Sequence, residues 1–154
     1  MKKTQPIFAI DPGNTFSAYI LFTPEKILFK GKISNEELML VLCTFRDEIV
    51  DCRLYIEGIA SYGMAVGKEV FQTCIWIGRF MQEFGADKTE IVYRQAIKVH
   101  HCNSVRAKDG NIRQALIDKY GIQGVKKDQG FTYGINADIW SALAIATYVY
   151  ETKK

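Results

Sequence analysis

Three acidic residues stand where apolar segments begin or end, which is where side chains with a chemical role are often held. Asp11 ends the apolar run 8–10 and is followed by a Pro-Gly turn. Glu57 ends a second apolar run and is followed by a glycine, and Asp138 opens the segment 138–146. If the two runs are neighbouring strands and the last segment is a helix packed on them, all three carboxylates meet at one point.

Carboxylates that meet in this way repel one another and are stable together only with a counter-cation. Oxygen ligands suit Mg²⁺ or Mn²⁺, and hydrolytic nucleases use such ions in pairs roughly 3.5–4 Å apart. The sequence therefore predicts a Mg²⁺ site at Asp11, Glu57 and Asp138, at which Mn²⁺ substitutes. The chemistry expected there is hydrolysis of a phosphodiester bond.

Each acid also has a purely structural interpretation. Asp11 could simply form the turn, and Glu57 could face solvent at a strand end. Asp138 could stabilise the N-terminus of a helix through the helix dipole, by roughly 0.3–1 kcal/mol. We favour one shared site, because it explains all three positions together.

The elements that must position these acids follow from apolar periodicity and turn residues. Short turns between the first three strands favour an antiparallel meander, and helical connections between the later ones favour parallel neighbours. The fold class is therefore α/β, with a mixed five-stranded sheet, a three-strand antiparallel meander plus parallel strands, flanked by helices; pattern alone does not exclude other mixed α/β folds. We expect strands at residues 7–10, 17–22, 26–33, 53–58 and 90–93, and helices over 34–49, 66–84, 111–119 and from 138 onward.

Several segments together carry a family resemblance. The chain resembles the RuvC-type Holliday-junction resolvases of the RNase H-like superfamily, and its middle part resembles RuvC-related proteins of bacteriophages and prophages. The resemblance covers nearly the whole chain in matching order. It rests on Ile10-Asp11-Pro12-Gly13, Tyr55-Ile56-Glu57, Tyr93-Arg94, Lys98, Arg106-Ala107-Lys108-Asp109, Asn111 to Leu116, and Ala137-Asp138 with Ala142 to Ala146.

The last helix departs from the family pattern at one position. The family usually carries a second metal-site acid three residues after the first, and this chain has Ser141 there. Residues 138 and 141 still share a helix face, so the Ser141 hydroxyl could bind the metal ion through water, or Asp138 alone could bind the ion from this helix. The substitution puts the number of metal ions in question.

The same resemblance implies contacts to DNA from Lys98, Arg106, Lys108 and Arg113. Tyr62 lies where RuvC-like enzymes place an aromatic side chain that stacks on a base, and a tyrosine packed in the core is the alternative. His100-His101-Cys102 has zinc-ligand types, but adjacent residues do not easily face one ion. We expect that segment to line the DNA path or to be an irregular surface loop.

Composition agrees with a compact nuclease. The chain has 154 residues, 48% of them hydrophobic, which predicts one core and a single domain over residues 1–154. A net charge of +3 is too small for a protein that coats DNA indiscriminately. Basic residues nevertheless exceed acids between residues 94 and 127, where they are Arg94, Lys98, Arg106, Lys108, Arg113, Lys119, Lys126 and Lys127.

The sequence also bears on location. Its four cysteines show no Cys-x-x-Cys spacing, and it has neither a signal-peptide pattern nor an apolar run of the roughly 20 residues that span a bilayer. We expect a reduced, cytoplasmic protein with no membrane attachment.

The function that these expectations imply is a Mg²⁺-dependent endonuclease that resolves Holliday junctions or other branched DNA by paired cuts. A homodimer would suit the twofold symmetry of a four-way junction, with the helix over 66–84 as the interface. One alternative is a protein of the same fold that binds branched DNA but cuts it weakly or not at all. Another is an RNase H-like nuclease acting on other substrates, such as RNA–DNA hybrids or flaps.

Overall fold

A mixed five-stranded sheet forms the centre of the molecule, whose computed structural model describes residues 4–153. The spatial order is β3-β2-β1-β4-β5, in which β1, β2 and β3 are antiparallel neighbours and β1, β4 and β5 are parallel neighbours. The predicted meander followed by parallel strands is confirmed. The strands are β1 (Ile7–Asp11), β2 (Phe16–Phe22), β3 (Ile27–Ser34), β4 (Arg53–Gly58) and β5 (Thr89–Tyr93).

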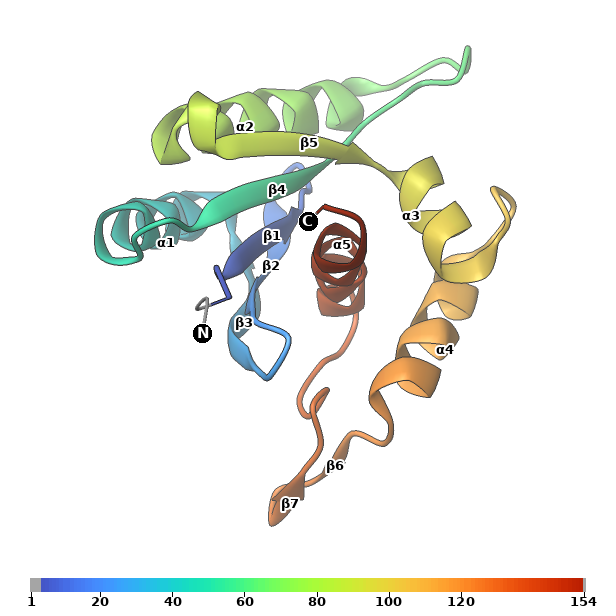
Figure 1. Ribbon diagram of the computed structural model, residues 1–154. Helices are drawn as coiled ribbons and strands as arrows, with labels where there is room; N and C mark the ends of the chain where they lie inside the picture. The colour runs from blue at the N-terminus through green and yellow to red at the C-terminus, as the bar shows by residue number, and fades with distance from the viewer. Residues whose placement is uncertain (1–3, 154) are drawn as a thin grey trace.

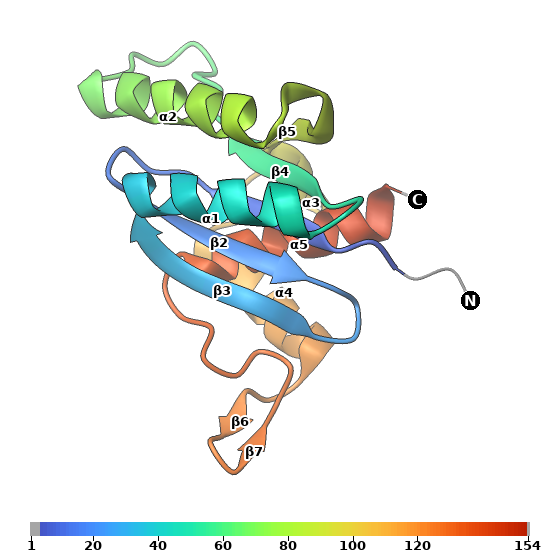
Figure 2. The same ribbon diagram turned by 90° about the vertical axis from the view of Figure 1, so that its left-hand side faces the viewer.

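Helices cover both faces of this sheet (Figures 1 and 2). Helices α1 (Asn35–Glu48) and α2 (Lys68–Phe84) lie on one face, and α5 (Ile139–Thr152) lies on the other. Helices α3 (Arg94–Cys102) and α4 (Asp109–Tyr120) pack outside α5, and the 3₁₀ turn η1 (Ala86–Lys88) precedes β5. None of the helices described in residues 4–153 is long and apolar enough to cross a membrane.

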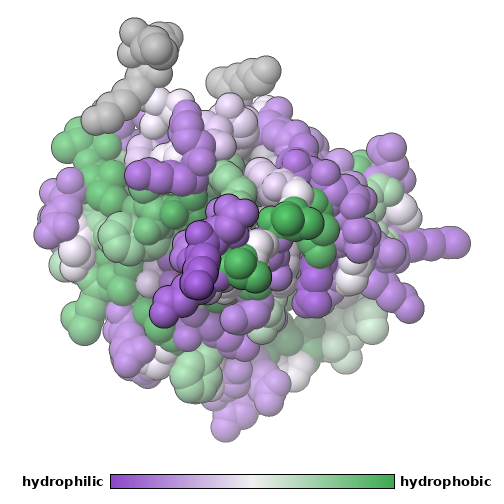
Figure 3. Space-filling model, turned by 90° about the horizontal axis from the view of Figure 1, so that it is seen from below, coloured by the Kyte–Doolittle hydropathy of each residue, from purple (hydrophilic) through white to green (hydrophobic). Residues whose placement is uncertain are grey.

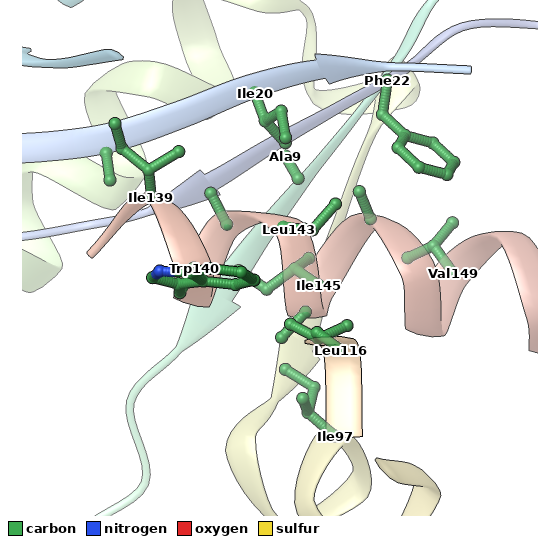
Figure 4. Packing of buried hydrophobic residues seen from close by; sticks show 14 of the residues in the cluster. Ala9, Ile20, Phe22, Ile97, Leu116, Ile139, Trp140, Leu143, Ile145 and Val149 are labelled. Carbon is green, nitrogen blue, oxygen red and sulfur yellow. The ribbon is translucent and has the colours of Figure 1, made fainter. Parts of the chain in front are cut away.

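Strand alternation divides the core into two clusters. Successive residues of a strand point to opposite faces, so Ala9 packs toward α5 whereas Phe8 and Ile10 pack toward α1 and α2. Figure 4 shows the first cluster, where Leu143, Ile145 and other side chains of α5 lie between β1, β2 and the outer helices. Because it is covered on two sides, α5 is apolar almost all the way round.

The helix ends follow local sequence signals. The Ser34 hydroxyl accepts a hydrogen bond from the Glu37 backbone N–H at 3.2 Å and caps α1. Helix α2 buries residues at three- and four-residue steps and ends at Gly85, whose φ of +115° favours glycine. The predicted end near Gly85 is confirmed, and α2 begins at Lys68 rather than at residue 66.

The irregular-loop alternative for His100-His101-Cys102 is wrong. These residues form the last turn of α3, and His101 Nε2 lies 2.9 Å from the Ala144 carbonyl oxygen of α5. A short hairpin of β6 (Gly124–Val125) and β7 (Asp128–Gln129), which was not predicted, follows α4. Figure 3 views the molecule from the hairpin side, where hydrophilic residues cover much of the face and hydrophobic patches lie between them.

Candidate active site

The strand register places Asp11 and Glu57 at the same edge of the sheet. Ile10 of β1 pairs in parallel with Ile56 of β4, so the next residue on each strand is one of the two acids. Asp138 is the N-cap residue of α5, which packs directly on β1 and β2. Elements far apart in the chain thus place Glu57 and Asp138 near enough to Asp11 for both to act on it electrostatically.

A closed set of hydrogen bonds fixes the turn that follows Asp11. The Ser17 hydroxyl donates to Asn35 Oδ1 at 2.6 Å and accepts from the Gly13 backbone N–H at 3.1 Å. Asn35 Nδ2 in turn donates to the Gly13 carbonyl oxygen at 2.9 Å. Ser17 and Asn35 are both buried, so each bond satisfies a polar group that lacks water. A Cβ atom at Gly13 would lie 2.2 Å from the Phe16 carbonyl oxygen, which explains the glycine.

The charge of Asp11 is costly in this setting. Burial raises the pKa of Asp11 from 3.8 to about 7, and the negative charges of Glu57 and Asp138 add to this effect. Arg94 and Lys32 oppose the shift but do not cancel it. In the described part of the chain the Asp11 carboxylate forms no hydrogen bond or ion pair, so a cation bound beside it would stabilise the ionised form.

Glu57 is held by a neighbouring arginine. Its side chain is only 12% exposed, and Arg94 Nη1 donates to Glu57 Oε1 at 3.3 Å. Burial raises the pKa of Glu57, and the charges of Arg94 and Lys98 partly offset this. The same Arg94 guanidinium also pairs with Asp109 at the start of α4. Arg94 therefore links the end of β5 to both Glu57 and α4.

Asp138 is paired with a lysine from the far side of the meander. Lys32 Nζ of β3 lies 2.5 Å from Asp138 Oδ2, and both side chains are partly exposed. Within residues 4–153 the Asp138 carboxylate makes no capping hydrogen bond to α5, so its role differs from that of an ordinary N-cap acid. Ala137 has a φ of +44°, in the left-handed region that costs a residue with a Cβ atom about 1 kcal/mol or more.

A small pocket opens beside Glu57 and Asp138, and Asp11 lies outside its lining. Its polar lining residues come from β4, both outer helices and the first turn of α5, and they are Glu57, Arg94, Asp109, Arg113, Asp138 and Ser141. Ser141 thus faces the same space as Asp138, one helical turn along α5. The pocket combines carboxylate, hydroxyl and guanidinium groups, which together suit a cation and a phosphate.

The donor chemistry fits a hard divalent cation, although the acids are not arranged as finished ligands. Among residues 4–153, no three Asp, Glu, His or Cys side chains are gathered closely enough to form a ready-made metal-binding group. Two of the acids are instead engaged in ion pairs, Asp138 with Lys32 and Glu57 with Arg94. Carboxylate and hydroxyl oxygens are nevertheless the ligands that Mg²⁺ prefers. To bind a metal ion, Asp138 or Glu57 would have to coordinate it while still paired with Lys32 or Arg94.

Comparison with solved structures addresses the fold of this chain. RuvC from T. thermophilus in complex with a Holliday junction substrate matches with a TM-score of 0.66 and 12% sequence identity, covering 95% of this chain and 93% of that chain. The chain has a RuvC-like fold. A second structure of Thermus thermophilus RuvC matches with a TM-score of 0.63 and 16% identity, covering 96% of each chain. No family model matches the sequence, and no curated protein matches it.

The RuvC-like fold distributes the predicted DNA-binding residues around the acids. Lys98 on α3 lies close enough to Glu57 to lower its pKa, and Arg113 on α4 lines the pocket with its guanidinium 5.9 Å from the Trp140 ring centroid. Arg106 and Lys108 are exposed in the connection between α3 and α4, outside the pocket lining.

Tyr62 lies in the loop between β4 and α2 of the RuvC-like fold. Its side chain is 59% exposed and its φ is +49°. The packed-core alternative for Tyr62 is therefore wrong, and stacking on a base remains a prediction.

Three charged residues of this site were not predicted as site residues. Arg94 directly follows β5, which is parallel to β4, so the rule that placed Glu57 at the sheet edge could have placed it too. Asp109 opens α4, lines the pocket and pairs with Arg94. Lys32 lies on the edge strand β3 and pairs with a residue 106 positions away, for which the sequence carries no signal.

Proposed function

We propose that this chain is a divalent-metal-dependent endonuclease that cuts branched DNA such as a Holliday junction. The observation that carries the proposal is that Asp11 and Glu57 end adjacent parallel strands of a RuvC-like fold, close enough to Asp138 for both Glu57 and Asp138 to act electrostatically on Asp11. One of the structures with this fold is a RuvC bound to a Holliday junction substrate. Phosphodiester hydrolysis is the reaction that an acidic site beside a basic surface supports.

Asp11, Glu57 and Asp138 would hold Mg²⁺ or Mn²⁺, and the Ser141 hydroxyl would add a neutral oxygen. When bound, such an ion stabilises charge on the phosphate and lowers the pKa of water. The protein's own part is to hold Asp11 in place through the hydrogen-bonded turn that follows it. Arg94 orients Glu57 and presents a guanidinium to the pocket in which a phosphate would lie.

The surface around the pocket supplies sequence-independent affinity for DNA. Lys98 and Arg113 flank the acids, and Arg106 and Lys108 extend the positive charge along the connection between α3 and α4. Contacts to phosphates position a substrate without reading its bases. The exposed Tyr62 ring could stack on an unpaired base, an interaction that contributes roughly 1–3 kcal/mol.

A homodimer through α2 is part of the proposal. Four residues at three- and four-residue steps leave an exposed apolar stripe on the outer face of α2, and they are Phe71, Cys74, Ile75 and Gly78. Such patches mark interfaces in soluble proteins. Light scattering should give a dimer for the wild type and a monomer for Phe71→Glu, with Ile122→Glu, at an exposed position outside α2, as the control. A monomeric wild type would exclude the dimer.

Cleavage is tested on a labelled four-way junction, a matched duplex and an RNA–DNA hybrid, in Mg²⁺ and in Mn²⁺. We expect paired cuts confined to the junction, lost in Asp11→Asn. The matched control is Asp87→Asn, because Asp87 lies before the start of β5, at the sheet edge opposite the site. Equal cutting by wild type and Asp11→Asn would refute the proposed site, and preferential cutting of the hybrid would refute the substrate.

A second candidate function is binding of branched DNA with weak or no cleavage. The neutral Ser141 and the ion pairs of Lys32 and Arg94 favour it, because they leave fewer free carboxylates for metal. Junction binding without cuts in either metal ion would select this candidate. A bacterial cytoplasmic location, a phage or prophage source and a role in DNA recombination or repair remain predictions from the family resemblance.

A further inference from the structure

Lys32 is a charged residue that the proposed function does not use. It lies on β3 opposite Ala18 of β2, and its ammonium reaches across the sheet edge to Asp138. The ion pair joins residues 106 positions apart in the sequence. The protein thus places the positive charge of a lysine side chain beside a carboxylate that we expect to bind metal.

The fixed charges in and next to the pocket leave little demand for a second metal ion. Four carboxylates are offset by four cations that pair with them, act on them or line the same pocket, and these cations are Lys32, Arg94, Lys98 and Arg113. Two divalent ions would therefore leave the region strongly positive. The carboxylates are those of Asp11, Glu57, Asp109 and Asp138.

The side chain at position 141 completes this pattern. Ser141 lines the same pocket as Asp138 and is neutral, so the first turn of α5 offers one carboxylate rather than two. A second ion would have to be held by fewer anionic ligands while lying near a tethered ammonium, which repels it. The neutral Ser141 and the Lys32 ammonium thus both disfavour binding of a second ion, whereas neither prevents binding of the first.

We propose that this site binds a single divalent ion and that the Lys32 ammonium supplies, beside Asp138, the positive charge that a second ion would otherwise supply. The proposal rests on the metal dependence proposed above and specifies its stoichiometry. Lys32 thereby becomes a fixed cation of the site. Loss of its charge should strengthen metal binding.

The test is a titration of the full chain with Mn²⁺ in the absence of DNA. Binding is measured by calorimetry and by electron paramagnetic resonance. We expect one Mn²⁺ per wild-type chain and none in Asp11→Asn. Lys32→Met should bind Mn²⁺ at least about tenfold more tightly, because one repulsive charge is removed. Lys30→Met, two residues earlier on β3, is the matched control and should bind like the wild type. Circular dichroism checks that each variant is folded.

The double variant Lys32→Met with Ser141→Asp should bind two Mn²⁺ ions and show their magnetic coupling. Two ions in the wild type would overturn the proposal while leaving a metal-dependent nuclease intact. Unchanged affinity in Lys32→Met, or one ion in the double variant, would also overturn it. A wild type that binds no Mn²⁺ would refute the metal dependence itself, so failure of the two proposals gives different results.

Discussion

Replacing Asp11 by Asn should stabilise the protein when divalent ions are absent. The wild-type carboxyl group ionises at pH about 4 in the unfolded chain and at about 7 in the folded one, because folding buries it near Glu57 and Asp138. A group with a raised pKa costs the folded state nothing below the unfolded value. The cost grows as the pH rises from about 4 and is complete above about 7. Asparagine has a similar shape and does not ionise.

The size of the effect follows from the pKa shift. A change from 3.8 to about 7 is about 3 pH units, and each unit corresponds to about 1.4 kcal/mol. Asp11→Asn should therefore raise the free energy of unfolding by up to about 4 kcal/mol at pH 8. In a chain of this length that corresponds to a rise in melting temperature of roughly 10 °C.

Thermal unfolding with EDTA at pH 4 and pH 8, followed by circular dichroism, measures this difference. The rise in melting temperature of Asp11→Asn over the wild type should be large at pH 8 and small at pH 4. Asp87→Asn should melt like the wild type at both pH values. Adding Mn²⁺ at pH 8 should stabilise the wild type and leave Asp11→Asn unchanged. An equal gain at both pH values, or a less stable Asp11→Asn at pH 8, would refute the electrostatic argument.

Three further changes test the turn and the basic surface. Gly13→Ala should lower the free energy of unfolding by about 1–3 kcal/mol in urea titrations because its Cβ would meet a backbone oxygen, whereas Gly110→Ala, which has open space, should not. Asn35→Ala should cost about 1–3 kcal/mol in the same assay, since the hydroxyl of Ser17 and a backbone carbonyl lose a buried partner; a neutral result would mean that water replaces the amide. Arg113→Ala should reduce the slope of log affinity against log salt by about 1 in fluorescence anisotropy with a junction, and an unchanged slope would remove Arg113 from the phosphate contacts.

The sheet was predictable because its signals are local. Each strand is a short apolar run between turn residues, and the lengths of the connections separate the antiparallel from the parallel neighbours. The same logic brought Asp11 and Glu57 to one edge, because adjacent parallel strands end at the same side. The sequence thus carried the relative direction of neighbouring strands and, once β1 and β4 are taken as neighbours, the place of two acids.

The rest depends on contacts that local patterns do not encode. Helix α3 is short and contains adjacent histidines, so its packing through Ile97 and His101 against α5 outweighs its weak helical signal. The nearly complete burial of α5 depends on α3 and α4 covering its outer side. Lys32 could not be found from sequence, since an exposed strand lysine looks the same whether it meets an acid or only solvent.

The placement of Asp11 and Asp138 on β1 and α5 has a consequence for how the molecule opens. These two elements pack against each other in the core, so their backbone amides should exchange hydrogen with solvent only when the whole chain unfolds. The connection between α3 and α4, which is mostly exposed, can open at a far lower free energy. The basic surface can therefore change its shape while Asp11 and Asp138 keep their positions, and heat should abolish the acidic site and the native fold in one cooperative step.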